Sequence, residues 1–248
     1  LKNTFNVIKV RKSDGRFLIE LDNELNEIKN KMKKIFGVAT FAIVDEFNFT
    51  TLDKLKEKIK SKYPEIKGKK FRITGKVIGK REFGTIELQK ILGEVLYNEG
   101  GIVKLKDFEL EIFVYIRGEK VQIYEEVIKG SYGLPVGSEG EVLVLFSGGI
   151  DSPVATYEIM KRGCKPDLLF INLGGEEHLK HVHKVYKKLC DNWALGVKVN
   201  MYVLNGKEIV NLIKEKIKPS YRQIILKKCF YLAAEKLCIK NKYDAIVT

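Results

Sequence analysis

The chain has 248 residues, of which 45% are hydrophobic, and its formal net charge is +13 at pH 7. These values exclude an acidic, disordered class of protein and predict more than one folded unit with a buried core. No apolar run reaches the roughly 18 residues of a membrane helix, no secretory signal is visible, and the four cysteines form no CxxC pair, so we expect a cytoplasmic protein with no membrane contact and no disulfide framework.

The first 49 residues have the pattern of a small α+β unit. We expect two strands, at residues 6–10 and 16–21, joined by a tight turn at Ser13-Asp14-Gly15. An amphipathic helix at 24–36 and a third strand at 40–44 are expected to follow. This order is typical of a ferredoxin-like sandwich that lacks its first strand. Residues 1–49 are therefore expected to be a truncated N-terminal ferredoxin-like domain.

Residues 50–135 predict a second α+β unit. A helix capped by Thr50 or Thr51 is expected at 52–62, and a basic strand at 70–77. A second helix, capped by Thr85, is expected to run to the glycines at 100 and 101. Two strands, at 108–117 and 120–128, are expected to pair back across a turn. In the strand 108–117 the apolar side chains alternate, so one of its faces is expected to be buried. Five residues between 130 and 140 are Gly or Pro, which predicts a linker.

Positive charge is concentrated in the second unit. Residues 54–81 contain twelve Lys and Arg side chains but only two Glu. RNA, DNA and acidic membranes all suit such a density, because each phosphate that a cation neutralises releases condensed counterions. A solvated lysine-rich surface would give the same pattern.

From Glu141 onward, strands alternate with helices in βαβαβ order. The segments 142–146 and 167–172 are nearly continuous apolar runs, which is typical of parallel strands buried on both faces. Residues 136–248 are therefore expected to be a doubly wound α/β domain. The sequence ends within the last expected strand, so we expect this domain to be C-terminally incomplete.

A short loop, SGGIDS at residues 147–152, follows the first strand of this domain. Glycines let backbone N–H groups approach an anion, and Ser152 with Pro153 is expected to form the N-cap and first turn of the next helix, whose N-terminus favours negative charge. Asp151 would oppose phosphate unless it held Mg²⁺ between itself and the phosphates. Neither a Walker loop nor a dinucleotide-binding fingerprint is present, so this is a different phosphate loop.

The loop in its strand–loop–helix context resembles the pyrophosphate loop of ATP pyrophosphatases. Longer segments, among them "IKGSYGLPVGSEGEVLVLFSGGIDSPVA", "FINLGGEEHLKHVHKVY" and "RQIILKKCFYLAAEKLCIKNKYDAIVT", resemble the tRNA uracil 4-sulfurtransferases, the 4-thiouridine synthetases of the thiamine-linked group. "FRITGKVIGKREFGTIELQKILG" is similar to their RNA-binding THUMP domain. The resemblance implies an enzyme that adenylates O4 of uridine at tRNA position eight and replaces this oxygen with sulfur, with a further link to thiamine synthesis.

Carried over residue by residue, the resemblance implies Asp151 as the catalytic residue and as a ligand of Mg²⁺. The implied ATP-binding residues are Leu145, Phe146, Ser147, Gly148, Gly149, Ile150, Asp151, Ser152 and Lys227. The implied tRNA-binding residues are Arg72, Lys76, Lys80, Arg81 and Phe83. The implied cofactors are ATP and Mg²⁺, and the implied partners are tRNA, a sulfur donor (a persulfide-carrying protein or sulfide) and a second copy of the chain in a homodimer.

Several of these roles have ordinary alternatives. Lys227 could be an exposed helix lysine and Phe83 a core residue. Cys164 is a candidate sulfur carrier but also has the character of a small buried hydrophobe, and the three His of HxxHxH at 178–183 could bind a metal or simply begin a helix. At the level of the chain, the alternatives are another ATP-pyrophosphatase ligase and a tRNA-binding fragment without a complete catalytic site.

Overall fold

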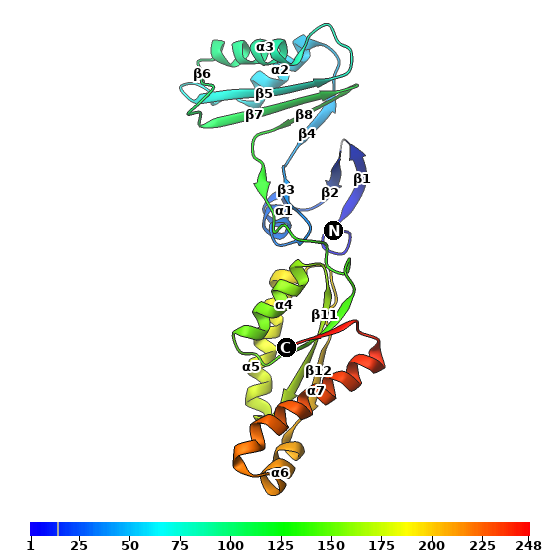
Figure 1. The fold of residues 1–248 in the computed structure, drawn as a ribbon. Coiled ribbons are helices and arrows are strands. Elements are labelled where there is room, and N and C mark those ends of the chain that lie inside the picture. The colour runs from blue at the N-terminus through cyan, green and yellow to red at the C-terminus, as the bar shows by residue number, and fades with distance from the viewer. Residues whose placement is uncertain (14) are drawn as a thin grey trace. The chain divides into compact units, whose positions relative to one another are not determined.

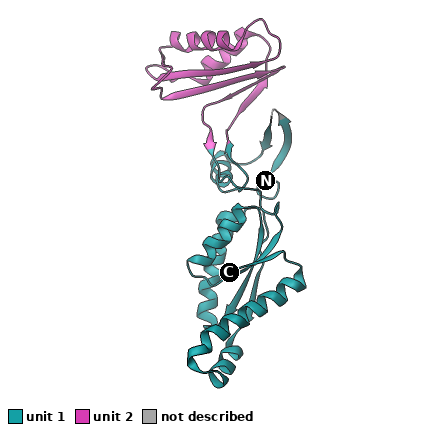
Figure 2. Ribbon diagram, viewed as in Figure 1, with its two compact units in different colours: residues 1–40, 129–248 teal, residues 41–128 magenta. Residues whose placement is uncertain are grey.

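The computed structural model describes residues 1–13 and 15–248, so Asp14 of the expected turn lies outside the described residues. The chain divides into two compact units, residues 41–128 and residues 1–40 together with 129–248 (Figure 2). The division into three domains at residues 49/50 and 135/136 stays a prediction. No helix in the described part of the chain is both long and apolar enough to cross a membrane.

The N-terminal strands β1 (Val7–Ser13) and β2 (Arg16–Leu21) form an antiparallel hairpin. The helix α1 (Leu25–Met32) ends four residues before the predicted position. The expected strand 40–44 is wrong: only β3 (Thr40–Phe41) lies within it, and a separate strand, β4 (Asp45–Asn48), begins after its expected end. The reason is a change of partner, because β3 pairs with β9 (Ile128–Lys129) and β4 pairs with β8 (Lys120–Tyr124) in another sheet. The hairpin and β3 therefore do not share one ferredoxin-like sheet.

Residues 41–128 form a five-stranded sheet in the order β4-β8-β7-β5-β6, with helices α2 and α3 packed on one face (Figure 1). Its remaining elements are α2 (Leu52–Lys62), β5 (Lys70–Ile78), α3 (Thr85–Asn98), β6 (Ile102–Val103) and β7 (Leu110–Arg117). The side chains of Ile112, Val114 and Ile116 in β7 are buried in the core that α2 and α3 form with the sheet, as the alternation predicts. Thr85 is the first residue of α3 and not its cap, because its hydroxyl accepts from the Val77 amide at 3.0 Å.

The second sheet has four parallel strands in the order β12-β11-β10-β13. The strands are β10 (Glu141–Leu145), β11 (Lys165–Asn172), β12 (Met201–Asn205) and β13 (Ala245–Val247), and the helices are α4 (Asp151–Lys161), α5 (Gly175–Trp193), α6 (Lys207–Lys216) and α7 (Arg222–Asn241), with a 3₁₀ turn at Pro219–Tyr221. Helices α4 and α5 pack on one face and α7 on the other (Figure 1), which confirms the doubly wound fold.

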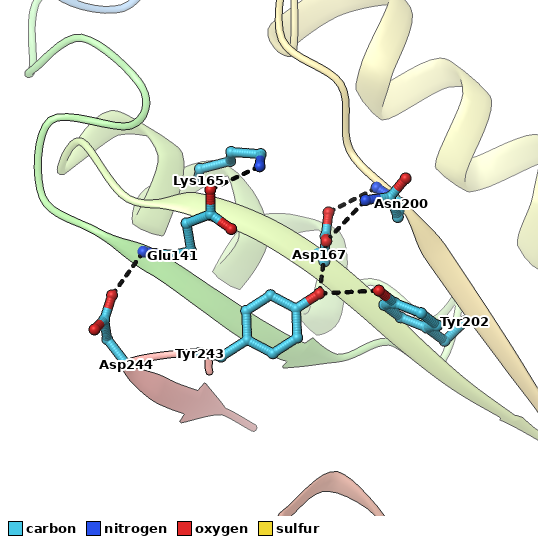
Figure 3. Close-up of polar contacts among 7 residues, drawn as sticks. All are labelled: Glu141, Lys165, Asp167, Asn200, Tyr202, Tyr243 and Asp244. Carbon is cyan, nitrogen blue, oxygen red and sulfur yellow. Dashed lines mark hydrogen bonds and ion pairs between the residues drawn. The ribbon is translucent and has the colours of Figure 1, made fainter. Parts of the chain in front are cut away.

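A buried carboxylate joins three strands at the amino ends of this sheet (Figure 3). Asp167, only 4% exposed, accepts hydrogen bonds from the amide and the side chain of Asn200 at 2.7 and 2.9 Å and from the Tyr243 hydroxyl at 2.6 Å. The hydroxyl oxygens of Tyr243 and Tyr202 are 3.2 Å apart, and because the Tyr243 proton is used by Asp167, Tyr243 accepts in this contact. Because the Asn200 amide is used in this way, β12 begins four residues later than predicted.

Replacing Tyr243 with phenylalanine is expected to lower the free energy of unfolding by about 1–2 kcal/mol, because Asp167 loses one of its donors. Burial and the hydrogen bond to Asp167 raise the pKa of Tyr243 above its usual value of 10.0. Its stabilising contribution is therefore complete below pH 10 and is lost as the pH rises further, since the unfolded tyrosine ionises first. Urea unfolding at pH 7 and pH 11 tests both points.

The matched control is Tyr231→Phe on the exposed side of α7, which should leave unfolding unchanged at either pH. A Tyr243→Phe variant as stable as the wild type at pH 7, with the same alkaline loss of stability, would contradict the role given to this hydrogen bond.

Candidate functional site

The loop between β10 and α4 lies at the switch point of the parallel sheet. β10 is flanked by β11 and β13. The connection that leaves β10 runs through α4 on one face, whereas α7, which leads into β13, lies on the other. Doubly wound sheets bind their ligands at the carboxyl ends of the strands where the connections diverge in this way. The candidate site is therefore the loop 146–150 with the first turn of α4.

Two serines close this loop. The Ser147 amide donates to the Ser152 hydroxyl at 3.1 Å, and the two hydroxyl oxygens are 3.3 Å apart. The Gly149 amide lies 3.4 Å from the Ser147 hydroxyl, which accepts from it. Ser152 is consequently not the N-cap, as the sequence predicted: α4 begins at Asp151, and the Ser152 side chain turns back to hold the start of the loop.

Helix α5 packs against the loop at Gly148. This residue has a left-handed backbone with φ of 73°, and a Cβ added to it would lie 2.6 Å from Val182 Cγ2. His181 Nε2 donates to the Gly148 carbonyl oxygen at 3.2 Å. Only glycine fits between the strand and the helix at this position. The loop is thus fixed by a steric and a polar contact from the same turn of α5.

The contacts of the HxxHxH histidines favour a role in packing over metal binding. His178 packs edge-on against Phe170 with ring centroids 5.0 Å apart, and His181 bonds to the loop. Within residues 1–13 and 15–248, no three His, Cys, Asp or Glu side chains are grouped to hold a metal ion. Sequence reasoning missed the loop contact, because it depends on how α5 lies against β10.

Asp151 stands at the exposed start of α4, next to Ile150, which is 86% exposed. Among the described residues, no hydrogen bond occupies the amides of Gly148, Ile150 or Asp151. Unoccupied amides at a helix N-terminus favour an anion, and one accessible carboxylate suits Mg²⁺, which typically binds one or two protein carboxylates together with the phosphates of its substrate. The residues present therefore fit a magnesium–phosphate group.

The other residues expected at the ATP site differ in how they can act. Phe146 is 2% exposed and its side chain lies in the core under α4 and α5, so only its backbone faces the loop. Leu145 is half-buried against the opposite face. Lys227 is exposed on α7, and no hydrogen bond or ion pair of the described residues joins it to the loop.

Two of the four cysteines, Cys164 and Cys190, have surroundings that do not favour a role at the loop. Cys164 precedes β11 and lies at the amino edge of the sheet, where its Sγ is 3.6 Å from the Glu139 carbonyl oxygen. Burial raises the pKa of the Cys190 thiol to about 11, so this group stays protonated and weakly nucleophilic at neutral pH. Neither position suits a sulfur carrier for the loop.

The expected tRNA-binding residues lie on β5 and on the loop that follows it. Lys76 and Lys80 are exposed. The other three are engaged in the fold: Arg72 pairs with Glu111 at 2.5 Å, Arg81 lies 4.1 Å from the Phe49 ring centroid and donates to the Gly118 carbonyl, and Phe83 packs on the core of this unit beside Phe49. Phe83 therefore has the contacts of a core residue, which is the alternative to a role in binding tRNA.

Two family models match the chain in order. Residues 48–126 match the THUMP domain, and residues 137–248 match the model described as thiamine biosynthesis protein (ThiI). The chain is 38% identical over its whole length to a probable tRNA sulfurtransferase of Saccharolobus solfataricus and 36% identical to one of Sulfurisphaera tokodaii. It spans 66% of the length of each of these relatives, which is just under two thirds.

Solved structures give the same picture. A 4-thiouridine synthetase crystallised with RNA and bound ATP superposes with a TM-score of 0.85 at 25% identity, over 96% of this chain and 64% of that chain. A protein from Pyrococcus horikoshii superposes with a TM-score of 0.67 at 25% identity, over 85% of this chain and 70% of that chain.

Proposed function

We propose that the chain belongs to the ThiI family of tRNA sulfurtransferases and takes part in ATP-dependent thiolation of tRNA, adenylating O4 of the uridine at position eight before sulfur replaces that oxygen. The observation that carries this proposal is the loop 147–152, which presents unoccupied amides and one carboxylate at the switch point of the sheet. The sulfurtransferase relatives and the ATP-bound structural neighbour support the same assignment.

In the proposed reaction, uracil O4 attacks the α-phosphorus of ATP. A new P–O bond forms, the bond to the β-phosphate breaks, and pyrophosphate leaves with the electron pair. The amides of Gly148, Ile150 and Asp151 stabilise the negative charge that develops on the leaving group, since donors fixed in advance need no reorganisation during the step. The adenylated oxygen is then a good leaving group for the incoming sulfur.

Asp151 is proposed to hold Mg²⁺ against the phosphates. When bound, this ion would neutralise phosphate charge and so favour departure of pyrophosphate. The chain itself contributes the carboxylate, and the Ser147–Ser152 contacts tie the start of α4, where Asp151 stands, to the loop. Lys227 is proposed as a further contact to the nucleotide.

The THUMP domain is proposed to bind the tRNA, with the exposed Lys76 and Lys80 as its first contacts; the proposed contacts of Arg72, Arg81 and Phe83 would require these side chains to keep their partners in the fold or exchange them for RNA. The RNA-bound structural neighbour supports an RNA partner, and the basic segment 54–81 supports a polyanion. A persulfide-carrying protein or sulfide as sulfur donor, a homodimer, a cytoplasmic location and a role in supplying sulfur for thiamine are further parts of this proposal. The last of these rests on the description of the ThiI family model alone.

The proposal is tested by incubating the protein with Mg²⁺, α-labelled ATP and an unmodified tRNA transcript, then separating AMP from ADP. AMP that appears only with tRNA is the expected result. ADP as the product would contradict an ATP pyrophosphatase. AMP formation without tRNA would favour a ligase of small molecules, and tight, salt-sensitive tRNA binding without any turnover would favour a tRNA-binding module.

A further inference from the structure

The sheet of residues 41–128 has an open face on the side opposite α2 and α3. The buried residues of β5, β7 and β8 point to the helices, so their neighbours in the alternation point to the other side. Strand register arranges these neighbours in four rows: Arg72 and Glu111; Thr74, Phe113 and Tyr124; Lys76, Tyr115, Gln122 and Glu46; Ile78, Arg117, Lys120 and Asn48.

Aromatic rings occupy the centre of this face. Phe113 and Tyr124 are directly opposite each other on β7 and β8, with ring centroids 4.7 Å apart and an interplanar angle of 7°. Tyr115 lies in the next row, with Lys76 Nζ 5.8 Å from its ring centroid. None of the three rings is needed to fill the core, since all stand on the side of the sheet away from it.

The charge on this face is unevenly distributed. The two acidic groups have polar partners within the face, because Glu111 accepts from Arg72 and Thr74, and Glu46 accepts from Gln122 at 2.9 Å. The cations Lys76, Arg117 and Lys120 gather in the last two rows, beside the aromatic centre. The face therefore combines stacking rings with a cationic border.

We propose that Phe113, Tyr115 and Tyr124 form a stacking platform for unpaired bases of an RNA, with Lys76 and Lys120 contacting the phosphates that flank them. Every base has a π-face, so such a platform binds single-stranded nucleotides with little dependence on sequence, and the cations follow the backbone. A protein partner would suit this face less well, because Lys76 and Lys120 would have to be paired or desolvated. The inference rests on the proposed tRNA partner and specifies how the partner is held.

The test measures binding of the full chain to a fluorescently labelled tRNA transcript over a series of salt concentrations. The Phe113→Leu, Tyr124→Leu double variant should bind about tenfold more weakly for each base that is no longer stacked, with the same salt slope as the wild type. The Lys76→Gln, Lys120→Gln double variant should instead show a salt slope shallower by roughly 0.7 for each lost phosphate contact.

Two controls separate stacking from stability. Tyr97→Leu removes an exposed ring, 62% accessible, from α3 on the other side of the sheet and should bind as the wild type does. The Phe113→Tyr, Tyr124→Phe double variant keeps both rings and should also bind normally. Thermal unfolding of each variant checks that the sheet remains folded.

The outcomes distinguish this proposal from the proposed function. A wild type that binds tRNA and a leucine double variant that binds equally well would overturn the platform and leave tRNA binding intact. Loss of binding in the ring-retaining double variant would overturn stacking as the mechanism. A wild type without salt-dependent tRNA binding would overturn both proposals together.

Discussion

Replacing Asp151 with asparagine is expected to reduce tRNA-dependent release of pyrophosphate by roughly a hundredfold to a thousandfold, the range seen when one fixed electrostatic group is lost from an active site. Asparagine has the same shape but carries no charge, so it cannot hold Mg²⁺ against the phosphates as a carboxylate does. Asp151 is exposed at the first position of α4, so the fold should not depend on it. Pyrophosphate release under saturating tRNA is the measurement.

The matched control is Glu158→Gln, which removes an exposed carboxylate from the same helix two turns further on. This variant should release pyrophosphate at the wild-type rate and unfold at the same temperature as Asp151→Asn. A fully active Asp151→Asn protein would show that the carboxylate takes no part in adenylation. Equal losses in both variants would point to a general effect of charge on the binding of nucleotide or tRNA.

Much of the C-terminal fold could be predicted from local patterns. The strands β10 and β11 are apolar throughout, and such runs separated by helices specify a parallel sheet whatever their order. The start of β12 could not be predicted in this way. Residues 197–200 have strand character, but Asn200 bonds to Asp167 on a neighbouring strand, a contact that is distant in sequence.

The N-terminal region shows the same limit more clearly. One strand was predicted at 40–44, yet residues 40–48 contribute two short strands to two different sheets, because β9 pairs with β3 and β8 pairs with β4. Local propensity identifies a strand but carries no information about its partner. The hairpin β1–β2 was predicted correctly, because its two strands are neighbours in the sequence, although β1 extends three residues beyond its predicted end.

For the candidate site, the glycine-rich motif identified the loop but not what holds it. The contact from His181 and the packing of Val182 under Gly148 come from α5, more than thirty residues away. On the sheet of residues 41–128, the buried residues of β7 were recognised because they repeat with period two. Phe113 and Tyr115 on its other face give a weaker signal, because they stand between the charged Glu111 and Arg117 and make only a short apolar repeat.

Replacing Gly148 with alanine is expected to impair both folding stability and ATP turnover. The left-handed backbone alone costs a residue other than glycine about 1–2 kcal/mol, and the new methyl group would lie 2.6 Å from Val182 Cγ2. Relief of this contact would push the loop away from α5 and shift its amides by a fraction of an ångström to an ångström. A displacement of that size can reduce turnover by roughly a hundredfold. Thermal unfolding and pyrophosphate release measure the two effects.

Gly149→Ala is the control for stability, because its backbone is not left-handed and a Cβ there would find nothing closer than the Ser147 hydroxyl at 3.5 Å. This variant should unfold at the wild-type temperature, whereas Gly148→Ala should unfold earlier. The double variant Gly148→Ala, Val182→Ala should recover part of the lost turnover, since the side-chain clash is removed while the backbone strain remains. If Gly148→Ala were as stable and active as the wild type, the loop would not be held against α5 as the structure describes. Packing against α5 would then not be the reason for glycine at this position.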